Sequence, residues 1–379
     1  MKQNALDIVH LVENLERGGL ERCVIDLALA QVAAGHQCRV ICLFEKGPLA
    51  TELEREGVRV DACGKRSGFD LRALMRLRRL LKASPGAVLH THNAVAHYHG
   101  VLSAYGLRLG NIVNTRHGMG GSATSRRSEH RYRRAMPRTD YVVAVCEAAR
   151  YRLQEDCVEP RRELLSIPNG IYGEKFQRAN QAARVSLLQE LGLPADSRVI
   201  GTVGRLAAVK DQATLVRALR SLRRAIPAVL VIVGDGPMRE PLAALVAEEG
   251  LDAAVRLLGD RGDVAGLLAG FEVFALSSTS EGYSIALLEA AMSGLPIVAT
   301  DVGGNHEIVR DRVAGRLVPP NDPEAMAAAL LDVLGDRQRA SSMGDEGHRW
   351  ARVEASVHTM AGRYLRLYAA KPHAGAEQA

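Results

Sequence analysis

The sequence predicts an α/β protein built from two doubly wound, parallel-sheet domains, and three observations lead to this prediction. Short β-branched apolar runs alternate with longer helical patterns, as they do in βαβ units. This alternation restarts near residue 198, after a polar stretch at 174–184. The length of 379 residues exceeds what one hydrophobic core usually accommodates. We therefore expect two doubly wound sheets that bind ligands in a cleft, at the carboxyl ends of their strands.

Six strands and three helices are expected in the first half of the chain. Glycine or polar residues bound the apolar runs, and Gly35 ends the first helix. The expected strands are 8–12, 39–44, 58–60, 87–90, 111–114 and 141–145. The expected helices are 21–34, 49–56 and 71–82.

The second half repeats the same alternation. The expected strands are 198–203, 228–233, 255–258, 273–276, a run that ends at 300, and 315–318. The expected helices are 212–224, 264–269, an apolar helix that follows Glu281, and further helices from Pro323 onward. We place the boundary between the domains at 178, inside the polar stretch.

Composition narrows the class of protein. Apolar residues make up 47% and charged residues 24%, as in globular proteins. No apolar run approaches the roughly 20 residues that span a bilayer, and Asp7 and His10 interrupt the first apolar stretch. We therefore expect a cytoplasmic protein. Six scattered cysteines form no C-x-x-C pair, so neither a disulfide framework nor a zinc site is expected.

Positive charge is concentrated in the first half, where residues 1–175 hold 27 Lys and Arg against 19 Asp and Glu. Two clusters stand out: Arg72, Arg76, Arg78, Arg79 and Lys82, and then Arg126, Arg127, Arg131, Arg133 and Arg134. Such clusters suit anionic lipid at the inner membrane face or a phosphorylated acceptor, and a solvated helix face is the alternative. Aromatic residues, at 4%, do not interleave the clusters, so no nucleic-acid partner is expected.

The segment 280–289, Ser-Glu-Gly-Tyr-Ser-Ile-Ala-Leu-Leu-Glu, is the most informative motif. It places Glu281 in a loop and Glu289 eight residues later, within an apolar helix. A helix N-terminus offers unpaired N–H groups and partial positive charge to phosphate or sugar oxygens. Glu289 suits a ribose diol and Glu281 the hydroxyls of a sugar. A capped helix with one solvated glutamate is the alternative.

Arg205 and Lys210 follow the strand 198–203 in Gly-Arg-Leu-Ala-Ala-Val-Lys-Asp. Two cations in a strand-to-helix loop suit a diphosphate, and they stabilise the negative charge that develops as a nucleoside diphosphate departs. The alternative is an ordinary basic surface loop.

Two further junctions lie in the first half. Gly18 and Gly19 follow the first strand and allow a ligand phosphate to approach the backbone closely, although a simple turn is the alternative. His117 follows the strand 111–114, where an imidazole suits a sugar hydroxyl, with a structural histidine as the alternative.

Weaker signals are a second histidine group and a basic residue near a nucleobase position. His90, His92 and His97, with Asn93, follow one strand; we interpret them as a hydrogen-bonding wall rather than a metal site, because no carboxylate joins them. Arg261 follows the strand 255–258, where it suits a base or a phosphate. No D-x-D occurs, so no metal is expected.

Together these motifs resemble the ordered motif set of retaining glycosyltransferases of family four, over nearly the whole chain. The matching segments are Gly18-Gly19, His117, Gly204-Arg205 with Lys210, Gly234-Asp235-Gly236-Pro237, Glu281 to Glu289, and Gly303-Gly304 through Glu307. The resemblance implies a GT-B fold with an acceptor-binding domain at 1–178 and a donor-binding domain at 179–349. It also implies that helices at 350–370 pack back on the first domain.

The resemblance also implies roles for single residues. Arg205 and Lys210 would hold the diphosphate, with Gly18 and Gly19 contributing backbone groups, and Glu289 would hold the ribose. The donor sugar would meet Glu281, His117 and the loop Gly282, Tyr283 and Ser284. The family often has glycine where this chain has Ser284, and that difference leaves the identity of the donor sugar open.

The expected activity is that of a metal-independent retaining hexosyltransferase. It would move a sugar from a nucleotide donor, most frequently UDP-linked, to an acceptor hydroxyl in polysaccharide, lipopolysaccharide or glycolipid synthesis. No cofactor besides the nucleotide sugar is expected. The alternatives are a sugar-nucleotide epimerase of similar fold, a non-catalytic nucleotide-sugar sensor, and a basic nucleic-acid-binding protein.

Overall fold

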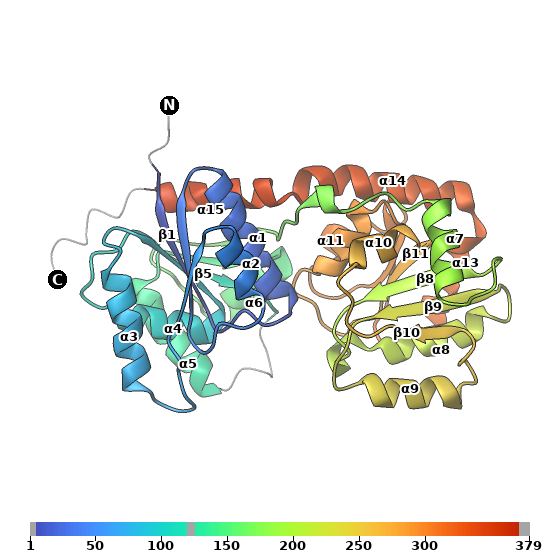
Figure 1. Ribbon diagram of the computed structural model, residues 1–379, viewed down its shortest axis with the longest axis horizontal. Coiled ribbons are helices and arrows are strands. Elements are labelled where there is room, and N and C mark those ends of the chain that lie inside the picture. Colours follow the sequence, from blue (N-terminus) through green and yellow to red (C-terminus); the bar gives the residue numbers. More distant parts are fainter. Residues whose placement is uncertain (1–4, 120–125, 371–379) are drawn as a thin grey trace. The chain divides into compact units, whose positions relative to one another are not determined.

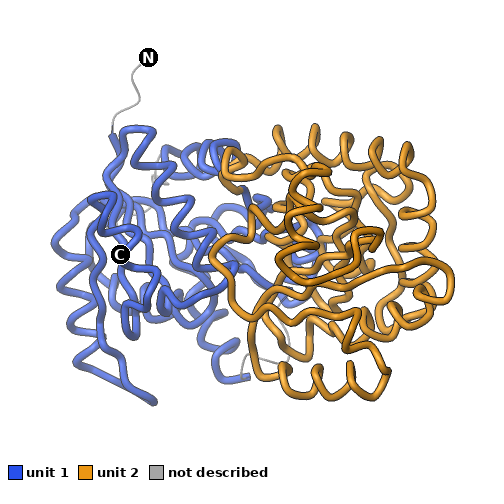
Figure 2. The backbone as a smooth tube through the Cα atoms, turned by 45° about the vertical axis from the view of Figure 1, so that its right-hand side comes forward, with its two compact units in different colours: residues 1–170, 357–379 blue, residues 171–356 orange. Residues whose placement is uncertain are grey.

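The computed structural model describes residues 5–119 and 126–370, which form two compact units. Unit 1 comprises Met1–Gly170 and Val357–Ala379, and unit 2 comprises Ile171–Ser356 (Figure 2). The division therefore falls at Gly170, ahead of the boundary expected at 178. No helix in the described ranges is both long and apolar enough to cross a membrane.

Unit 1 contains a seven-stranded parallel sheet of order β3-β2-β1-β4-β5-β6-β7 (Figure 1). The strand order reverses between β1 and β4, and this position is the topological switch point at which doubly wound folds bind ligands. The strands are β1 Asp7–Val12, β2 Gln37–Cys42, β3 Arg59–Ala62, β4 Val88–His92, β5 Ile112–Arg116, β6 Tyr141–Ala144 and β7 Glu163–Ser166.

Helices cover both faces of this sheet, and the last helix of the chain is one of them. Asn111 Nδ2 lies within 3.0 Å of the Leu367 carbonyl oxygen and 3.1 Å of that of Tyr368, which fastens α15 to the edge of β5. Buried side chains of α3 and α4 pack on one face, and those of α1 and α2 on the other. The helices are α1 Gly19–Ala33, α2 Ala50–Arg55, α3 Leu71–Lys82, α4 Asn93–Ser103, α5 Arg126–Ala135, α6 Glu147–Glu155 and α15 Val357–Ala369.

Unit 2 contains a six-stranded parallel sheet of order β10-β9-β8-β11-β12-β13. Its switch point lies between β8 and β11, because the strands that follow β8 along the chain first extend one way and then the other. The strands are β8 Arg198–Val203, β9 Ala228–Val233, β10 Val255–Leu257, β11 Val273–Leu276, β12 Ile297–Thr300 and β13 Gly315–Val318.

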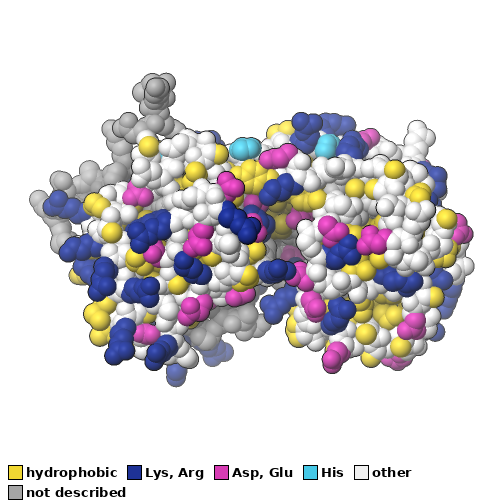
Figure 3. All heavy atoms as spheres, in the orientation of Figure 1, with side chains coloured by type: hydrophobic (Ala, Val, Ile, Leu, Met, Phe, Trp, Pro, Cys, Tyr) yellow, Lys and Arg dark blue, Asp and Glu magenta, His cyan; other side chains and the backbone are white. Residues whose placement is uncertain are grey.

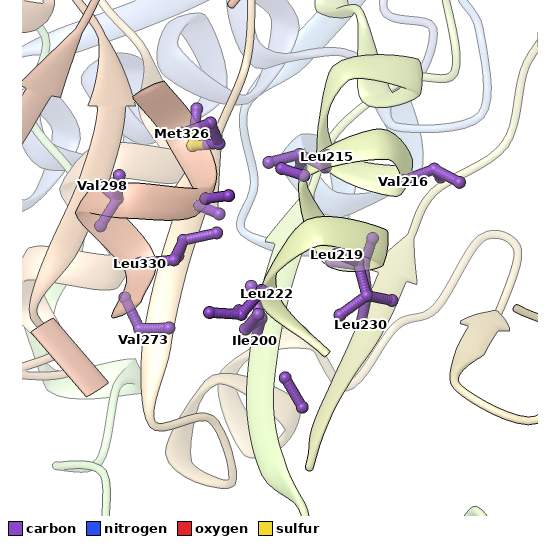
Figure 4. Close-up of a cluster of buried hydrophobic side chains, with 14 of the residues drawn as sticks. Ile200, Leu215, Val216, Leu219, Leu222, Leu230, Val273, Val298, Met326 and Leu330 are labelled. Carbon is purple, nitrogen blue, oxygen red and sulfur yellow. The ribbon is translucent and has the colours of Figure 1, made fainter. Parts of the chain in front are cut away.

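The core of unit 2 joins this sheet to α8 and α13. Leu215, Leu219 and Leu222 of α8 meet Ile200 of β8, while Met326 and Leu330 of α13 lie by Val273 and Val298 (Figure 4). Asp322 caps α13 by accepting from the Ala325 N–H. The helices are α7 Gln181–Glu190, α8 Gln212–Leu222, α9 Arg239–Glu248, α10 Val264–Ala269, α11 Ile285–Met292, α12 Asn305–Ile308, α13 Pro323–Gly335 and α14 Arg337–Glu354.

The expected strands and helices are present within one to three residues at most ends, and the structure adds elements that the patterns did not predict. The additions are β7 and the helices α4, α5, α6, α7, α9 and α12. The polar stretch at 174–184 is not a plain linker, because α7 begins inside it and Asn180 caps it by accepting from the Ala183 N–H. Capping was the missed signal, since an Asn before a mixed helix marks an N-terminus.

Candidate functional site

The switch point of unit 2 brings two predicted motifs together. The loop that leaves β8 carries Arg205 and Lys210, and the loop that leaves β11 carries Glu281. Parallel strands end at the same edge of the sheet, so both loops converge although Lys210 and Glu281 are far apart in sequence. The convergence predicted from separate motifs is therefore present in the fold.

Lys210 and Glu281 form an ion pair, with 2.5 Å between Nζ and Oε1. The Ser278 hydroxyl donates to the same carboxylate oxygen at 2.6 Å. The Glu281 side chain is only 8% exposed and that of Lys210 is 26% exposed. A buried carboxylate needs a partner, and the ammonium group retains donors for a second anion because it carries three N–H bonds.

Hydrogen bonds between the two loops hold this pair in place. The Ser277 hydroxyl lies 3.1 Å from the Lys210 carbonyl oxygen and 2.7 Å from that of Asp211. Asp211 has a φ of 43°, in the left-handed region, and its carboxylate accepts from the Thr214 hydroxyl at 2.6 Å. Lys210 thus projects from a braced turn rather than from a free loop.

The glycine motif at 234–237 lets the neighbouring loop approach the Arg205 turn. A Cβ on Gly234 would lie 2.1 Å from the Gly204 carbonyl oxygen, and one on Gly236 would lie 2.4 Å from that of Leu206. Any side chain at these positions would force the two loops apart. Arg205 is exposed and forms no ion pair with the residues that the structure describes.

The loop 282–284 leads into α11, as predicted. Ser284 is the extended N-cap residue, its side chain makes no capping hydrogen bond, and the first turn of α11 holds no acidic residue. The Gly304 N–H donates to the Gly282 carbonyl at 3.0 Å, so the Gly303-Gly304 motif braces this loop. Tyr283 is buried, and Glu289 lies half-buried within α11. This helix end therefore keeps its positive character for an anion.

Arg261 is engaged differently from Arg205. Its guanidinium pairs with Asp263 at 2.6 Å and with Glu190 at 3.1 Å. The hydrogen bonds that Arg261 donates to Asp263 and then to Glu190 raise the pKa of Arg261. A diphosphate would have to displace both carboxylates, so the predicted ligand role of Arg261 is not supported by its contacts.

At the switch point of unit 1, Gly19 begins α1 and Gly18 precedes it in extended conformation. The first turn of α1 carries Glu21, and a Cβ on Gly18 would lie 2.4 Å from its Oε2 atom. Burial raises the pKa of Glu21, and that of nearby Glu13 as well. The sequence prediction missed Glu21, which lies two residues after the glycine pair. A carboxylate so close to Gly18 would oppose a phosphate at this position.

His117 lies just beyond β5, as predicted, and neighbouring residues fix it. Its backbone N–H donates to Asn93 Oδ1 at 3.0 Å, and Asn93 is held with a φ of 62°. Its Nε2 lies 2.9 Å from His92 Nδ1. Its Nδ1 is buried and has no hydrogen-bond partner among the described residues. Burial lowers the pKa of His117 to about 3, so the ring is neutral near pH 7.

The histidine group differs in membership from the predicted one. His10 of β1 joins His90 and His92. His97 instead extends from α4 and hydrogen-bonds to the hydroxyls of Thr91 and Thr139. In the described part of the chain, His10, His90 and His92 bring ligand atoms within 4.8 Å of one another. The position of His10 in the apolar run of β1 could have signalled this, because a buried histidine between Val9 and Leu11 must find a partner inside the fold.

The basic helix α3 carries exposed apolar side chains among its cations (Figure 3). Its own residues Ala73, Leu77 and Leu81 form the buried face of the helix. Arg78 is engaged within the unit, since its Nη1 donates to the Ser103 carbonyl at 3.0 Å. The exposed apolar residues are Phe69 (80%), Leu71 (57%) and Met75 (53%), and the exposed cations are Arg72, Arg76, Arg79 and Lys82.

Comparison with known proteins identifies the family. Residues 17–174 match the model of Glycosyltransferase Family 4, and residues 185–350 match that of Glycosyl transferases group 1. The chain is 30% identical over 281 residues to UDP-Gal:alpha-D-GlcNAc-diphosphoundecaprenol alpha-1,3-galactosyltransferase of Escherichia coli, and the match covers 71% of each protein. The chain belongs to the group 1 glycosyltransferases.

Two further relatives of this glycosyltransferase act in glycolipid or lipopolysaccharide synthesis by their names, and one is named for a different nucleotide. The chain is 33% identical over 227 residues to a GDP-mannose-dependent alpha-(1-6)-phosphatidylinositol monomannoside mannosyltransferase of Mycolicibacterium smegmatis, covering 57% of this chain and 58% of that enzyme. A lipopolysaccharide core biosynthesis glycosyltransferase of Rhizobium meliloti is 32% identical over 184 residues, covering 48% of this chain and 53% of that enzyme.

Solved structures confirm the predicted GT-B fold of the glycosyltransferase. HepE of Anabaena, in complex with UDP and glucose, matches with a TM-score of 0.85 and 22% identity, covering 96% of this chain and 99% of HepE. WaaG, a glycosyltransferase involved in lipopolysaccharide biosynthesis, matches with a TM-score of 0.76 and 20% identity, covering 96% of this chain and all of WaaG.

Proposed function

We propose that this glycosyltransferase retains the anomeric configuration and moves a sugar from a UDP-sugar to a hydroxyl of a saccharide or lipid-linked acceptor. The observation that carries the proposal is the braced Lys210–Glu281 pair at the unit 2 switch point, beside exposed Arg205 and the uncompensated N-terminus of α11. The relative named for UDP-galactose and the UDP complex of HepE support UDP, and the relative named for GDP-mannose is the competing precedent.

The proposed reaction breaks the bond between the anomeric carbon and the phosphate oxygen of the donor. The acceptor oxygen bonds to that carbon on the same face, and the acceptor proton passes to the departing phosphate oxygen. Negative charge therefore grows on the diphosphate as the bond breaks. Arg205 and Lys210 stabilise this charge more in the transition state than in the ground state. With two cations and no D-x-D, we propose that no metal is required.

The remaining assignments follow the chemistry of each side chain. Glu289 accepts hydrogen bonds from the ribose diol, and Glu281 and the amides of 282–284 bind the donor sugar. Glu281 also holds the Lys210 ammonium, so one carboxylate links sugar recognition to charge stabilisation. The contacts of Gly18 and Gly19 with phosphate and of His117 with sugar remain predictions.

A donor panel followed by product analysis tests the proposal. UDP-, GDP-, ADP- and dTDP-sugars are compared by thermal shift, because a ligand that binds the folded state raises its melting temperature. The preferred donor is then incubated with lipid-linked and saccharide acceptors, with and without EDTA, and the anomer is read by NMR. A retained anomer, formed equally in EDTA, supports the proposal. An inverted product, epimerised or hydrolysed donor without acceptor, or no shift with any nucleotide sugar would contradict it.

We also propose that α3 holds the enzyme at the anionic cytoplasmic face of the inner membrane, near a lipid-linked acceptor. Exposed Phe69, Leu71 and Met75 suit the apolar edge of the headgroup region. The neighbouring cations each add about 1 kcal/mol of attraction to anionic lipid.

Flotation with vesicles tests this surface. Binding to phosphatidylglycerol vesicles should exceed binding to phosphatidylcholine vesicles and should fall when Arg72 and Arg76 are both changed to Glu. Phe69→Ser should weaken binding without changing its salt dependence. Arg217→Glu, on the exposed face of α8 in unit 2, is the matched control. Equal binding to both vesicles, or a double variant that floats like the wild type, would exclude α3 as the membrane surface.

A further inference from the structure

A row of buried imidazoles in unit 1 leads from α1 to the predicted sugar contact. Gln31 Oε1 lies 2.8 Å from His10 Nε2, His10 Nδ1 lies 3.1 Å from His92 Nε2, and His92 Nδ1 lies 2.9 Å from His117 Nε2. The register of β1 and β4 places His10 opposite His90, so these rings share one face of the sheet. His10 and His92 each use one ring nitrogen for the preceding member of the row and the other for the next member.

Such a row has a direction, because a neutral imidazole donates through one nitrogen and accepts through the other. If the Gln31 oxygen accepts, His10 must carry its proton on Nε2 and accept at Nδ1. His92 then donates from Nε2 and accepts at Nδ1, and His117 donates from Nε2. The end of the row is an unprotonated His117 Nδ1. Reversing the Gln31 amide would reverse every bond and leave a proton on that atom.

Contacts around Gln31 favour the first direction. Its Nε2 lies 3.3 Å from the Tyr368 hydroxyl, which lies 2.6 Å from His90 Nδ1, and the Cys38 thiol donates to its Oε1 at 3.5 Å. His90 then donates from Nε2 to the Thr115 hydroxyl at 2.8 Å. One orientation of the amide thus satisfies two branches.

The far end of the row favours the same direction. His117 Nδ1 is buried and has no partner among the described residues. A buried N–H without an acceptor is the rarer and more costly defect, so a bare lone pair is the better state for this atom.

We propose that Gln31, His10 and His92 are positioning residues that hold His117 as the Nε2–H tautomer, so that Nδ1 accepts a hydrogen bond from a sugar hydroxyl. The proposal rests on the proposed function only in naming the ligand a sugar. The row selects for an O–H donor and against a carbonyl or phosphate oxygen at that point. His117 touches the ligand, and the other three act through it.

Burial keeps the row neutral, which a directional row requires. Desolvation lowers the pKa of His10 to about 4 and holds that of His92 well below its usual range. Each ring therefore carries a single proton near pH 7. All six ring nitrogens of His10, His90 and His92 already take part in hydrogen bonds, so a metal ion would have to displace the bond at one nitrogen of each ring.

Nitrogen NMR of histidine-labelled, ligand-free enzyme tests the row directly, because protonated and unprotonated ring nitrogens resonate far apart. His117→Gln assigns the His117 signals. The wild type should show an unprotonated Nδ1 on His117. His92→Phe should shift the ring to a mixture of tautomers, and His92→Gln, which keeps one donor and one acceptor, should restore the wild-type pattern. His99→Phe is the matched control, since among the described residues the His99 ring hydrogen-bonds to the Val95 carbonyl and not to the row.

The outcomes separate the tautomer from the enzyme activity. A protonated Nδ1 in the wild type, or a His117 pattern unchanged by His92→Phe, overturns the proposal. Zinc that shifts the His10 and His92 signals at stoichiometric amounts, with reversal by EDTA, overturns it in favour of a metal site. Gln31→Leu gives a second break in the row if His92→Phe does not fold. None of these measurements needs a donor, so they stand even if the proposed donor is wrong.

Kinetics then tests what the tautomer is for. His92→Phe should lower kcat/KM roughly tenfold, the order expected for one lost hydrogen bond. A deoxy donor that lacks the contacted hydroxyl should lose a similar factor with the wild type and nothing further with the variant. If the loss from His92→Phe and the loss from the deoxy donor multiply at every deoxy position, His92 has a structural role and the positioning role is overturned.

Discussion

The two switch points have the same topology and opposite chemistry. In unit 2, between β8 and β11, the key side chains are charged and paired, and Lys210 is partly exposed. In unit 1, between β1 and β4, His10, His90 and His92 are almost fully buried and neutral. A buried charge survives only with a partner, whereas a buried imidazole gives up its proton. The two switch points share their topology, so the degree of burial decides whether a switch point offers charged groups or neutral groups with a fixed hydrogen-bond direction.

This division matches the two tasks of a glycosyl transfer. Charge develops on the departing diphosphate, so cations belong where that bond breaks. A sugar hydroxyl carries no charge, and its recognition depends on which atoms donate and which accept. We call Arg205, Lys210 and Glu281 of unit 2 the charged end, and His10, His92 and His117 of unit 1 the neutral end. The following substitutions test them separately, beginning with the largest expected effect.

Lys210→Ala should lower kcat by about 10²- to 10³-fold, the range for removing one preorganised donor from developing negative charge. Steady-state assays measure the loss, and urea unfolding checks that the variant is folded. Lys210→Arg keeps the charge and should recover part of the rate, while Arg217→Ala on α8 is the basic-residue control. Turnover equal to that of the wild type would remove Lys210 from the charged end.

Glu281→Gln should lower kcat/KM by about 10- to 100-fold, the order for losing a hydrogen bond to a charged group. The amide keeps a contact with Ser278 but no longer balances Lys210. Because Lys210 is partly exposed, unfolding free energy should change by no more than about 1 kcal/mol. A large loss of stability with nearly normal kinetics would make Glu281 a structural residue.

How far the sequence reached differs between the two ends. Glycines and cations near strand ends predicted the unit 2 loops, because that motif is local and each residue has one chemical use. The Lys210–Glu281 bond was not predicted, since each side chain was matched to a ligand and not to the other. In unit 1 the sequence grouped His90, His92 and His97 after one strand, but His97 lies on α4, a helix that the sequence patterns did not predict. Strand order also cannot be read from local patterns, so His10 was not connected to them.

His97→Gln should reduce the pH dependence of stability in unit 1. Burial, then Arg116, lowers the pKa of His97 to about 3, so the unfolded chain takes up a proton below about pH 6.5 that the folded protein does not. The free energy of unfolding therefore decreases as the pH is lowered below about 6.5, by about 1.4 kcal/mol per pH unit for this one group. Glutamine can keep the bonds to Thr91 and Thr139 without that proton.

Urea unfolding from about pH 7 down to about pH 5 measures the two slopes. As the pH falls, the unfolding free energy of the wild type should decrease more steeply than that of the variant, because the unfolded variant lacks one proton-uptake site. Curves that stay parallel over this interval would mean that His97 is protonated in the folded protein as well, and the neutral character of the buried imidazoles would be in doubt.

Arg261→Ala should have the smallest effect. Its guanidinium already serves Asp263 and Glu190, both at the surface, and such pairs contribute little to stability. We expect an unchanged urea midpoint and a change in donor kcat/KM of less than about threefold. Glu190→Gln is the informative control, because it loosens Arg261 without removing it. If Arg261→Ala instead cost more than about tenfold in donor kcat/KM and Glu190→Gln lowered donor KM, the two carboxylates would be competitors of the diphosphate for Arg261. The charged end would then include a third cation, released only when the donor displaces both carboxylates.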